Sequence, residues 1–387
     1  MANTLTGLIP TIYQALDIVS REMVGFIKAV TRNSSAARAA VGQTITYHIV
    51  PAITAGDIQP GTNPPDDGDQ TLGTDSLTIS KSRYAPVRWS GEEQKSLTNG
   101  ADPQLQNILR DQFAQAFRVL VNEVESDLGL TYKSASRAYG TAGTAPFGTA
   151  GDLSDLAQIR RILEDNGAPT SDLHIVLGSA AIANMRGKQN TLFKVNEAGT
   201  DELLRQGVIG MVEGVMVHNS AQVKTHTKGT GASYAVNNGA GYAVGSSTIA
   251  VDTGTGTIVA GDVLTNSQAG VDPNNKYVVK TALSGGSLVL NQPGIRSAWV
   301  DNDTVAVGNS YAANLGFSRN AIHLVTRAPA MPEGGDEADD VIELIDPISG
   351  LAFQIAKYRQ YRRVKYEVGL AWGTKAAKSE HMTILLG

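Results

Sequence analysis

The sequence contains no cysteine among its 387 residues, so disulfide bonds, thiolate metal ligands and a cysteine nucleophile are excluded. Charged residues make up only 18% of the chain and the formal net charge is −5, so no overall positive field is present to hold nucleic acid through its phosphates. No run approaches the roughly 18 apolar residues of a membrane helix, and residues 1–10 lack the basic start of an export signal. These absences predict a chain that is made in the cytosol and does not enter a membrane.

Aromatic side chains are also scarce, with seven Phe and three Trp against 41 Gly. Glycine supplies turn positions with positive φ, so this composition favours β structure and turns over a purely helical bundle. Residues 226–310 are rich in Gly, Thr, Val and Asn, and no Glu occurs from residue 214 to residue 332. We therefore expect a small β-barrel or sandwich inserted into a host domain, with strands at 248–251, 257–263, 276–281, 287–291 and 304–307.

Signatures of catalysis and metal binding are missing as well. No HExxH, GxSxG or GxxxxGK[ST] pattern occurs, and the two short Gly-x-Gly stretches in the inserted region lack the third glycine of a dinucleotide-binding motif. Acidic residues between 333 and 340, and the pair Asp301 and Asp303, do not follow an EF-hand pattern. The sequence therefore gives no catalytic residue, no metal and no cofactor.

The N-terminal region predicts an amphipathic helix over residues 11–31. Its apolar residues, which include Leu16, Met23 and Phe26, recur at helical spacing, and polar residues occupy the other faces. Burial against its own subunit and burial against a neighbouring subunit would satisfy this face equally well. On the second alternative, Leu16, Met23 and Phe26 are candidates for subunit contact.

A long hairpin is expected next. Apolar and polar residues alternate over 43–50 and at the start of a second strand predicted over 76–89, as in half-buried strands. Residues 52–73 between them are rich in Pro, Gly and Asp and form no core, which makes Asp66, Asp67 and Asp69 an acidic tip. Two strands bury too little to be stable alone, so the hairpin is either a mobile surface loop or an arm over an adjacent subunit.

A long helix is predicted over residues 102–129, where one apolar stripe continues for about seven turns. An α/β pattern follows, with helices from 152 and over 180–186 and strands over 172–177 and 215–217, and residues 196–206 continue this region. Later strands are expected over 320–327, over 341–358 with a turn at 346–350, over 363–372, and at the end of the chain. The later strands carry basic residues, including Arg359, Arg362 and Arg363, which either meet acidic hairpin tips of a neighbour or form a solvated strand face.

In this order, the elements resemble the major capsid proteins of tailed bacteriophages, a fold shared with the floor domain of herpesvirus capsid proteins. The resemblance is greatest to the short-tailed-phage coats that carry an inserted β-barrel. It rests on the N-terminal helix, the hairpin with its Pro/Asp tip and the long helix, and on the stretches 207–220, 320–332 and 368–375. It implies an α+β fold with the following divisions: N-terminal arm, 1–42; extended loop, 43–95; peripheral domain with a spine helix, 96–150; axial domain, 151–225 and 311–330; inserted β domain, 226–310; and C-terminal strands of the peripheral domain, 331–387.

The resemblance also implies a function without catalysis. The chain would assemble through pentamers and hexamers into an icosahedral shell that encloses double-stranded DNA, with itself, a scaffolding protein and a portal as partners, and packaged DNA held without sequence specificity. It would be built in the host bacterial cytoplasm and reside in the virion capsid. Two other classes stay open: a β-rich surface or adhesion protein, which the inserted region favours, and an α/β enzyme using residues 151–225.

Overall fold

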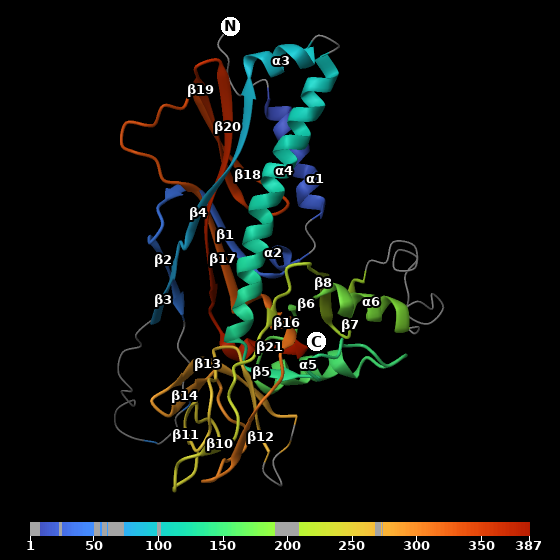
Figure 1. The fold of residues 1–387 in the computed structure, drawn as a ribbon, viewed down its shortest axis with the longest axis vertical. Helices are drawn as coiled ribbons and strands as arrows, with labels where there is room; N and C mark the ends of the chain where they lie inside the picture. The colour runs from blue at the N-terminus through green and yellow to red at the C-terminus, as the bar shows by residue number, and fades with distance from the viewer. Residues whose placement is uncertain are drawn as a thin grey trace.

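Helix α4 (Asp102–Gly129) runs along the long axis of the molecule (Figure 1), and its bounds are those predicted for the spine helix. Its 28 residues span about 42 Å at 1.5 Å per residue. The computed structural model describes residues 8–22, 25–49, 55, 60, 73–98, 102–189, 209–267, 272 and 274–387. Within these residues, two large sets of paired strands and five further helices are arranged around and below α4.

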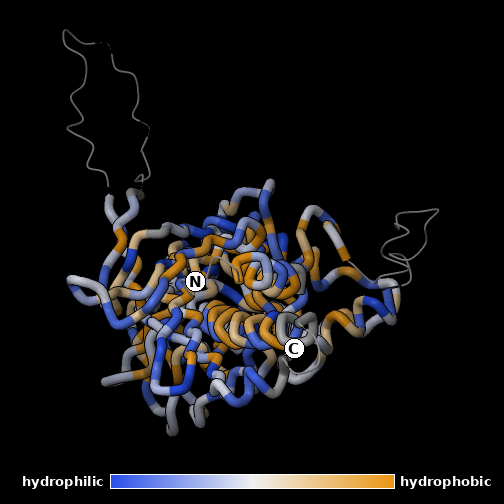
Figure 2. Tube along the Cα trace, turned by 90° about the horizontal axis from the view of Figure 1, so that it is seen from above, coloured by the Kyte–Doolittle hydropathy of each residue, from blue (hydrophilic) through white to orange (hydrophobic). Residues whose placement is uncertain are grey.

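One face of α4 is buried against a sheet and against the first helix. Phe113 meets Tyr366 edge to face at 5.6 Å between ring centroids, and Phe117 meets Phe353 at 4.9 Å. Helix α1 (Ile9–Glu22) packs along α4 with Ile12, Leu16 and Val19 buried. Viewed from above, apolar residues are concentrated in the middle of the molecule around these helices (Figure 2). The apolar stripe of α4 therefore holds the N-terminal helix and the sheet in one core.

The N-terminal region does not form the single helix predicted over 11–31. Helix α1 ends at Glu22, a four-residue helix α2 (Phe26–Ala29) follows, and strand β1 begins at Thr31. Gly25 precedes α2 at a point where a Cβ atom would lie 2.3 Å from the Glu125 carboxylate of α4. The break therefore arises because the backbone closely approaches a buried carboxylate, which only glycine permits.

The first sheet contains six strands. Its order is β1-β17-β20-β19-β18, and β4 pairs with the other edge of β20; only β1 and β17 are parallel. The predicted strands over 341–358 and 363–372 are confirmed, with longer bounds for the second. The strands are β1 (Thr31–Ala39), β4 (Lys81–Ser90), β17 (Ile322–Pro329), β18 (Asp340–Ile345), β19 (Ala352–Gln360) and β20 (Arg363–Ala376).

The second strand of the predicted hairpin is divided in two. Residues 73–78 form β3, which pairs with β2 (Thr44–Ile49), whereas β4 leaves this pair and joins the six-stranded sheet. Ile79 lies at the break and is buried beneath the sheet with Leu77, Val325 and Ala371. Helix α3 (Gly91–Thr98) spans the predicted boundary at residue 95 between the extended loop and the peripheral domain.

The second set of strands joins the α/β region to the inserted region. Helices α5 (Ser154–Asp165) and α6 (Ser179–Lys188) confirm the predicted α/β pattern; residues 196–206 lie outside the described residues. The predicted divisions put residues 331–387 in the peripheral domain and residues 311–330 in the axial domain. Strand β21 instead pairs with β16 in this second set of strands, and β17 lies in the six-stranded sheet. Outside the insert, the strands are β5 (Arg137–Tyr139), β6 (Leu173–Leu177), β7 (Met211–Val212), β8 (Val215–Asn219), β9 (Thr225–His226), β16 (Tyr311–Ser318) and β21 (Met382–Leu386).

The insert closes on itself. Its strands follow the order β12-β15-β10-β11-β14-β13, and β12 also pairs with β13, so the pairing forms a six-stranded ring around buried residues such as Tyr277 and Trp299. The barrel alternative is therefore the one observed. The predicted strand at 257–263 is wrong, because Asp262 accepts the Val259 N–H in a turn before β12. The strands are β10 (Tyr234–Val236), β11 (Thr248–Asp252), β12 (Val263–Asn266), β13 (Lys276–Ser284), β14 (Ser287–Leu290) and β15 (Thr304–Val307).

Truncation of Phe117 tests the importance of the contact between α4 and the sheet. Phe117 is fully buried, so Phe117→Ala is expected to lower the free energy of unfolding by about 3–5 kcal/mol in urea titrations. Val119→Ala on the exposed face of α4, where the side chain is 54% exposed, is expected to change it by less than about 0.5 kcal/mol. Equal losses for the two variants would show that the stripe is not what stabilises the fold.

Candidate assembly surfaces

Strands β2 and β3 form a two-stranded ribbon whose base is fastened to the six-stranded sheet. The Tyr47 hydroxyl donates to Asp75 at 2.6 Å, and Lys375 of β20 donates to the same carboxylate and to the Ser76 carbonyl. The Tyr47 ring stacks on His323 of β17, with 5.0 Å between ring centroids. The hydrogen bond from Lys375, followed by that from Tyr47, lowers the pKa of Asp75, which favours the charged carboxylate. The direction of the ribbon is therefore set at its base.

The predicted acidic tip cannot be placed in the same way. Asp66, Asp67 and Asp69 lie outside the described residues, as does Met23. Their contacts with a neighbouring subunit stay predictions.

Leu16 and Phe26 are not available as subunit contacts in this structure. Leu16 is 1% exposed and Phe26 is 0% exposed, both within the core that α1, α2 and α4 share. Of the two alternatives for the N-terminal apolar face, burial within its own chain is therefore the one observed. The physical reason is that α4 supplies an apolar surface long enough to cover α1 completely on this side.

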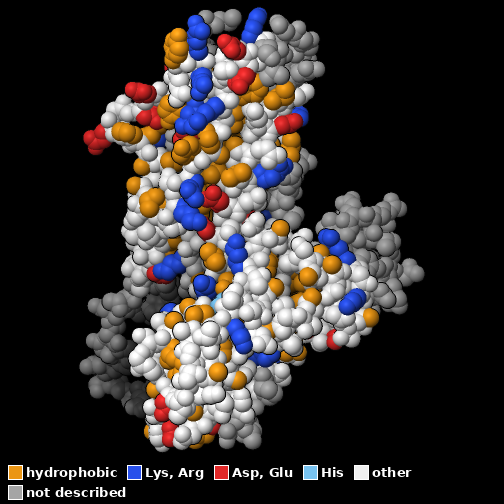
Figure 3. Space-filling model, viewed as in Figure 1, with side chains coloured by type: hydrophobic (Ala, Val, Ile, Leu, Met, Phe, Trp, Pro, Cys, Tyr) orange, Lys and Arg blue, Asp and Glu red, His pale blue; other side chains and the backbone are white. Residues whose placement is uncertain are grey.

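The three candidate arginines lie together around the tight turn between β19 and β20. Arg359 forms an ion pair with Asp339, Arg362 occupies the turn with φ +55°, and Arg363 is exposed. Tyr361 between them is 87% exposed, and the Arg362 guanidinium lies 5.5 Å from the centroid of its ring. Basic side chains are visible at this end of the molecule in Figure 3. We call residues 361–363 the basic tip.

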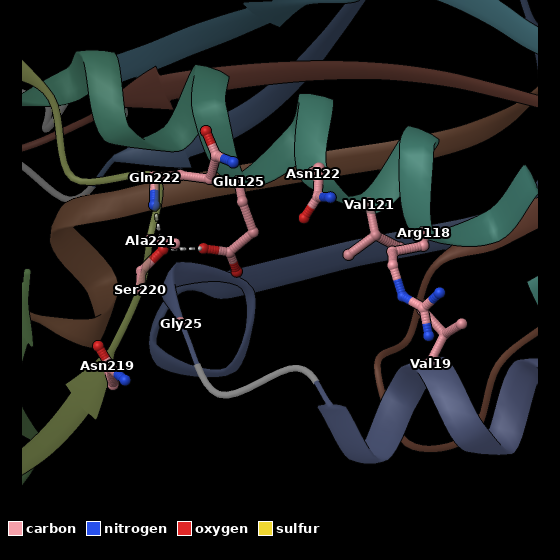
Figure 4. Close-up of a pocket in the computed structure, with 10 residues that line it drawn as sticks. All are labelled: Val19, Gly25, Arg118, Val121, Asn122, Glu125, Asn219, Ser220, Ala221 and Gln222. Atoms are coloured by element: carbon pink, nitrogen blue, oxygen red, sulfur yellow. Dashed lines mark hydrogen bonds between the residues drawn. The ribbon is translucent and has the colours of Figure 1, made fainter. Parts of the chain in front are cut away.

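A buried carboxylate at the centre of the molecule was missed in the sequence. Glu125 of α4 accepts the N–H groups of Phe26 and Ile27, each at 2.8 Å, and the Ser220 hydroxyl at 3.1 Å. Figure 4 shows it pointing from α4 towards Gly25 and Ser220, beside a pocket of about 290 Å³. Burial raises the pKa of Glu125, although its three hydrogen bonds act in the opposite direction. The sequence does contain a sign of this buried carboxylate, because Glu125 lies four positions after Val121, within the apolar stripe of the predicted helix.

A second buried polar group fastens the insert to the host. The Tyr132 hydroxyl lies 2.8 Å from His226 Nδ1, and His226 Nε2 lies 2.9 Å from Asp262 Oδ1. All three side chains are at most 4% exposed, and Asp262 also accepts backbone N–H groups of the barrel, including that of Gly229 at 3.0 Å. Because no side is open to a substrate, this chain of hydrogen bonds is best understood as a structural joint.

Two further properties bear on function. Among the described residues, no three or more His, Asp or Glu side chains are grouped so as to hold a metal ion. Across the same part of the chain, no helix has the length and apolar character needed to span a membrane.

Removing the Glu125 carboxylate tests its role at the start of α2. Glu125→Ala leaves two backbone donors and the Ser220 hydroxyl without this acceptor, so a loss of about 1–3 kcal/mol in the free energy of unfolding is expected, with faster hydrogen exchange of the Phe26 and Ile27 amides. Glu123→Ala is the control, because Glu123 pairs with Arg83 near the surface and should cost at most about 1 kcal/mol. Unchanged exchange at Phe26 and Ile27 would contradict the assignment.

The raised pKa of Glu125 makes a separate prediction. The folded chain binds this proton more tightly than the unfolded chain, so the contribution of Glu125 to stability is complete below the ordinary pKa of 4.5 and is lost as the pH rises through the folded pKa. As the pH is raised from 4.5, the urea midpoint of the parent chain should therefore fall more than that of Glu125→Gln, which has no titrating proton at this position. Parallel curves for the two chains would refute this.

Comparison with known proteins gives matches among solved structures only, since no family model and no curated protein matches. The chain is similar to a structure of Mycobacterium phage Che8, with TM-score 0.46, 10% identity, and coverage of 93% of this chain and 90% of that one. The capsid of Cyanophage P-SCSP1u matches with TM-score 0.46 and 11% identity, over 94% of this chain and 88% of that one. A virus-like particle from Pyrococcus furiosus matches with TM-score 0.44 and 9% identity, over 97% of this chain and 98% of that one. At these TM-scores and identities, the function has to be argued from the chain itself.

Proposed function

We propose that this chain is the shell-forming coat protein of a tailed bacteriophage. The observation that carries the proposal is the ribbon of β2 and β3. It has two strands and is tied to the six-stranded sheet at its base by Asp75, Lys375 and Tyr47. A two-stranded ribbon is marginally stable by itself in water, so a ribbon of fixed direction gains most from a surface on another molecule. The order of elements in the sequence, which resembles that of tailed-phage coat proteins, supports another copy of the chain as that molecule.

Closed shells form when one subunit presents complementary surfaces that repeat around symmetry axes, so that each contact is used many times. A ribbon, a sheet edge and a hairpin tip together can bury more than the roughly 1,200–2,000 Å² of a standard interface. In the proposed shell, the copies are arranged as pentamers and hexamers around double-stranded DNA, and a scaffolding protein and a portal take part in assembly. The proposed site of assembly is the host cytoplasm, and the mature location is the virion capsid.

The charge of the chain is consistent with this role. A net charge of −5 gives a mildly negative wall, which would not bind packaged DNA tightly or hinder its movement. The proposed role is structural, and none of the described side chains is needed to make or break a bond. Contact between Asp66, Asp67 and Asp69 of one copy and the arginines of another is part of the proposal.

Shortening the ribbon tests the proposal. We expect the purified parent chain to sediment as large closed particles that are visible by negative-stain electron microscopy. Replacing residues 44–78 by a short Gly-Ser turn should abolish particles while leaving the circular dichroism spectrum largely intact, because the main core contains none of these residues and the replacement affects only the small cluster around Ile79. A parent chain that stays monomeric, or a shortened chain that assembles as well as the parent, would overturn the proposal.

A further inference from the structure

The outer face of the six-stranded sheet, opposite α4, contains a hollow of about 160 Å³. Its floor is made by the small residues Gly369 and Ala356, and its walls by Tyr84, Tyr358 and the segment 329–332 between β17 and β18. Tyr84 lies on the side of β4 opposite Ala85, Val87 and Trp89, which are buried in the core with α4. We call this feature the outer hollow.

The walls of the outer hollow already hold a cation. Lys365 Nζ lies 4.8 Å from the centroid of the Tyr84 ring and 5.4 Å from that of Tyr358, and it forms an ion pair with Glu367. Ring faces attract ammonium and guanidinium groups, more strongly when water is excluded. Because Lys365 already occupies both ring faces, a further positive charge would be accommodated at the rim of the hollow and not between the rings.

The rim of the outer hollow adds negative charge. The loop between β17 and β18 carries Glu333, Asp336 and Glu337, all exposed, and within the described part of the chain none of the three forms an ion pair. Asp336 accepts the Tyr358 hydroxyl at 2.6 Å, which connects the rim to the wall. A partner for this surface should therefore bring positive charge together with an apolar or aromatic group.

The basic tip has these properties. Tyr361 is 87% exposed, and neither Arg362 nor Arg363 forms an ion pair with a described residue. Arg362 has φ +55° in a two-residue turn where glycine or asparagine is usual, at a cost on the order of 1 kcal/mol. Tyr and Arg are also the residue types that contribute most to binding energy in protein interfaces. The turn has an unfavourable backbone conformation and exposes one tyrosine and two arginines to solvent. Binding of these side chains to a partner protein would explain why the chain has this turn.

The tip and the outer hollow cannot meet within one chain. Tyr358 lines the hollow, and Tyr361 lies three residues further along the same hairpin, about 10 Å away at 3.3 Å per residue. The antiparallel pairing of β19 and β20 is unbroken from Gln354 and Gly369 to Gln360 and Arg363, so the turn follows at the end of the ladder, away from the sheet face that contains the hollow. One chain therefore carries two complementary surfaces that only a second copy can bring together.

We propose that the basic tip of one copy binds in the outer hollow of a neighbouring copy, with Tyr361 against the Tyr84 and Tyr358 walls and Arg362 and Arg363 beside the acidic rim. The inference rests on the proposed function and names one of its contacts. Two different surfaces are joined, so the contact is heterologous and generates a ring when the rotation between copies closes. For Arg362 and Arg363 this contact is an alternative to the one with Asp66, Asp67 and Asp69 in the proposed function, and the experiment below distinguishes the two.

Because the chain has no cysteine, single cysteines test this contact directly. Differently tagged Tyr361→Cys and Met331→Cys chains are co-assembled and oxidised, and a disulfide-linked heterodimer is expected. Tyr361→Cys with Val300→Cys on the distant barrel is the control, which should give no link. Assembled particles without a link between residues 361 and 331 would overturn the inference and leave the proposed function intact. In a parallel mixture of Tyr361→Cys and Asp67→Cys chains, a disulfide link would instead assign the basic tip to the hairpin of residues 43–79. If the parent chain forms no particles, both fail.

Charge reversal supplies a second measurement. Arg362→Glu with Arg363→Glu, and separately Glu333→Lys with Glu337→Lys, should each raise the concentration needed for assembly roughly tenfold, because like charges then face each other. The chain that carries all four changes should assemble nearly as the parent does, since complementarity is restored. Arg161→Glu with Lys280→Glu, both exposed and away from the hollow, is the matched control. Failure of the fourfold variant to recover, although it is folded by circular dichroism, would contradict the contact.

Discussion

Burial of one face of α4 is the constraint on which the rest of the structure depends. Phe113 and Phe117 pack on the six-stranded sheet, α1 packs alongside, and the Glu125 carboxylate in the same stripe holds the start of α2 and the Ser220 hydroxyl. The C-terminal end of α4 leads to Tyr132, which joins the inserted barrel through His226 and Asp262. Since all these parts are organised around one long helix, the ribbon, the basic tip and the outer hollow have fixed positions relative to one another.

Periodicity predicted much of this fold. The apolar stripe gave α4 its observed bounds, and β-rich stretches separated by turn residues located β18, β19 and most of the barrel strands. The errors occurred where tertiary contacts override local pattern. Gly25, which lies against Glu125, interrupts the predicted single helix before α2. Ile79 breaks a strand because it enters a core below the sheet, and Asp262 replaces a strand by a turn. Which sheet receives β17 and β21 depends on pairing between residues far apart in the sequence, which one sequence does not reveal.

The candidate assembly surfaces were predicted in part. A basic cluster near Arg362 could be expected from sequence, since the three arginines flank a tight turn, and the structure brings them together. For Leu16 and Phe26 the sequence leaves open whether their own subunit or a neighbour covers them, because a helical stripe does not say what packs on it. The outer hollow could not be predicted, because Gly369, Tyr84 and Met331 come from three distant segments. What the fold leaves exposed is thus consistent with surfaces that pair between copies.

The central claim is that the β2–β3 ribbon lies on another copy of the chain. The most direct measurement is a cryo-electron microscopy reconstruction of the particles that the purified chain forms. The account predicts a closed shell in which each ribbon crosses the surface of an adjacent subunit. A reconstruction in which the ribbon contacts only its own subunit, and no part of it touches a neighbour, would contradict it.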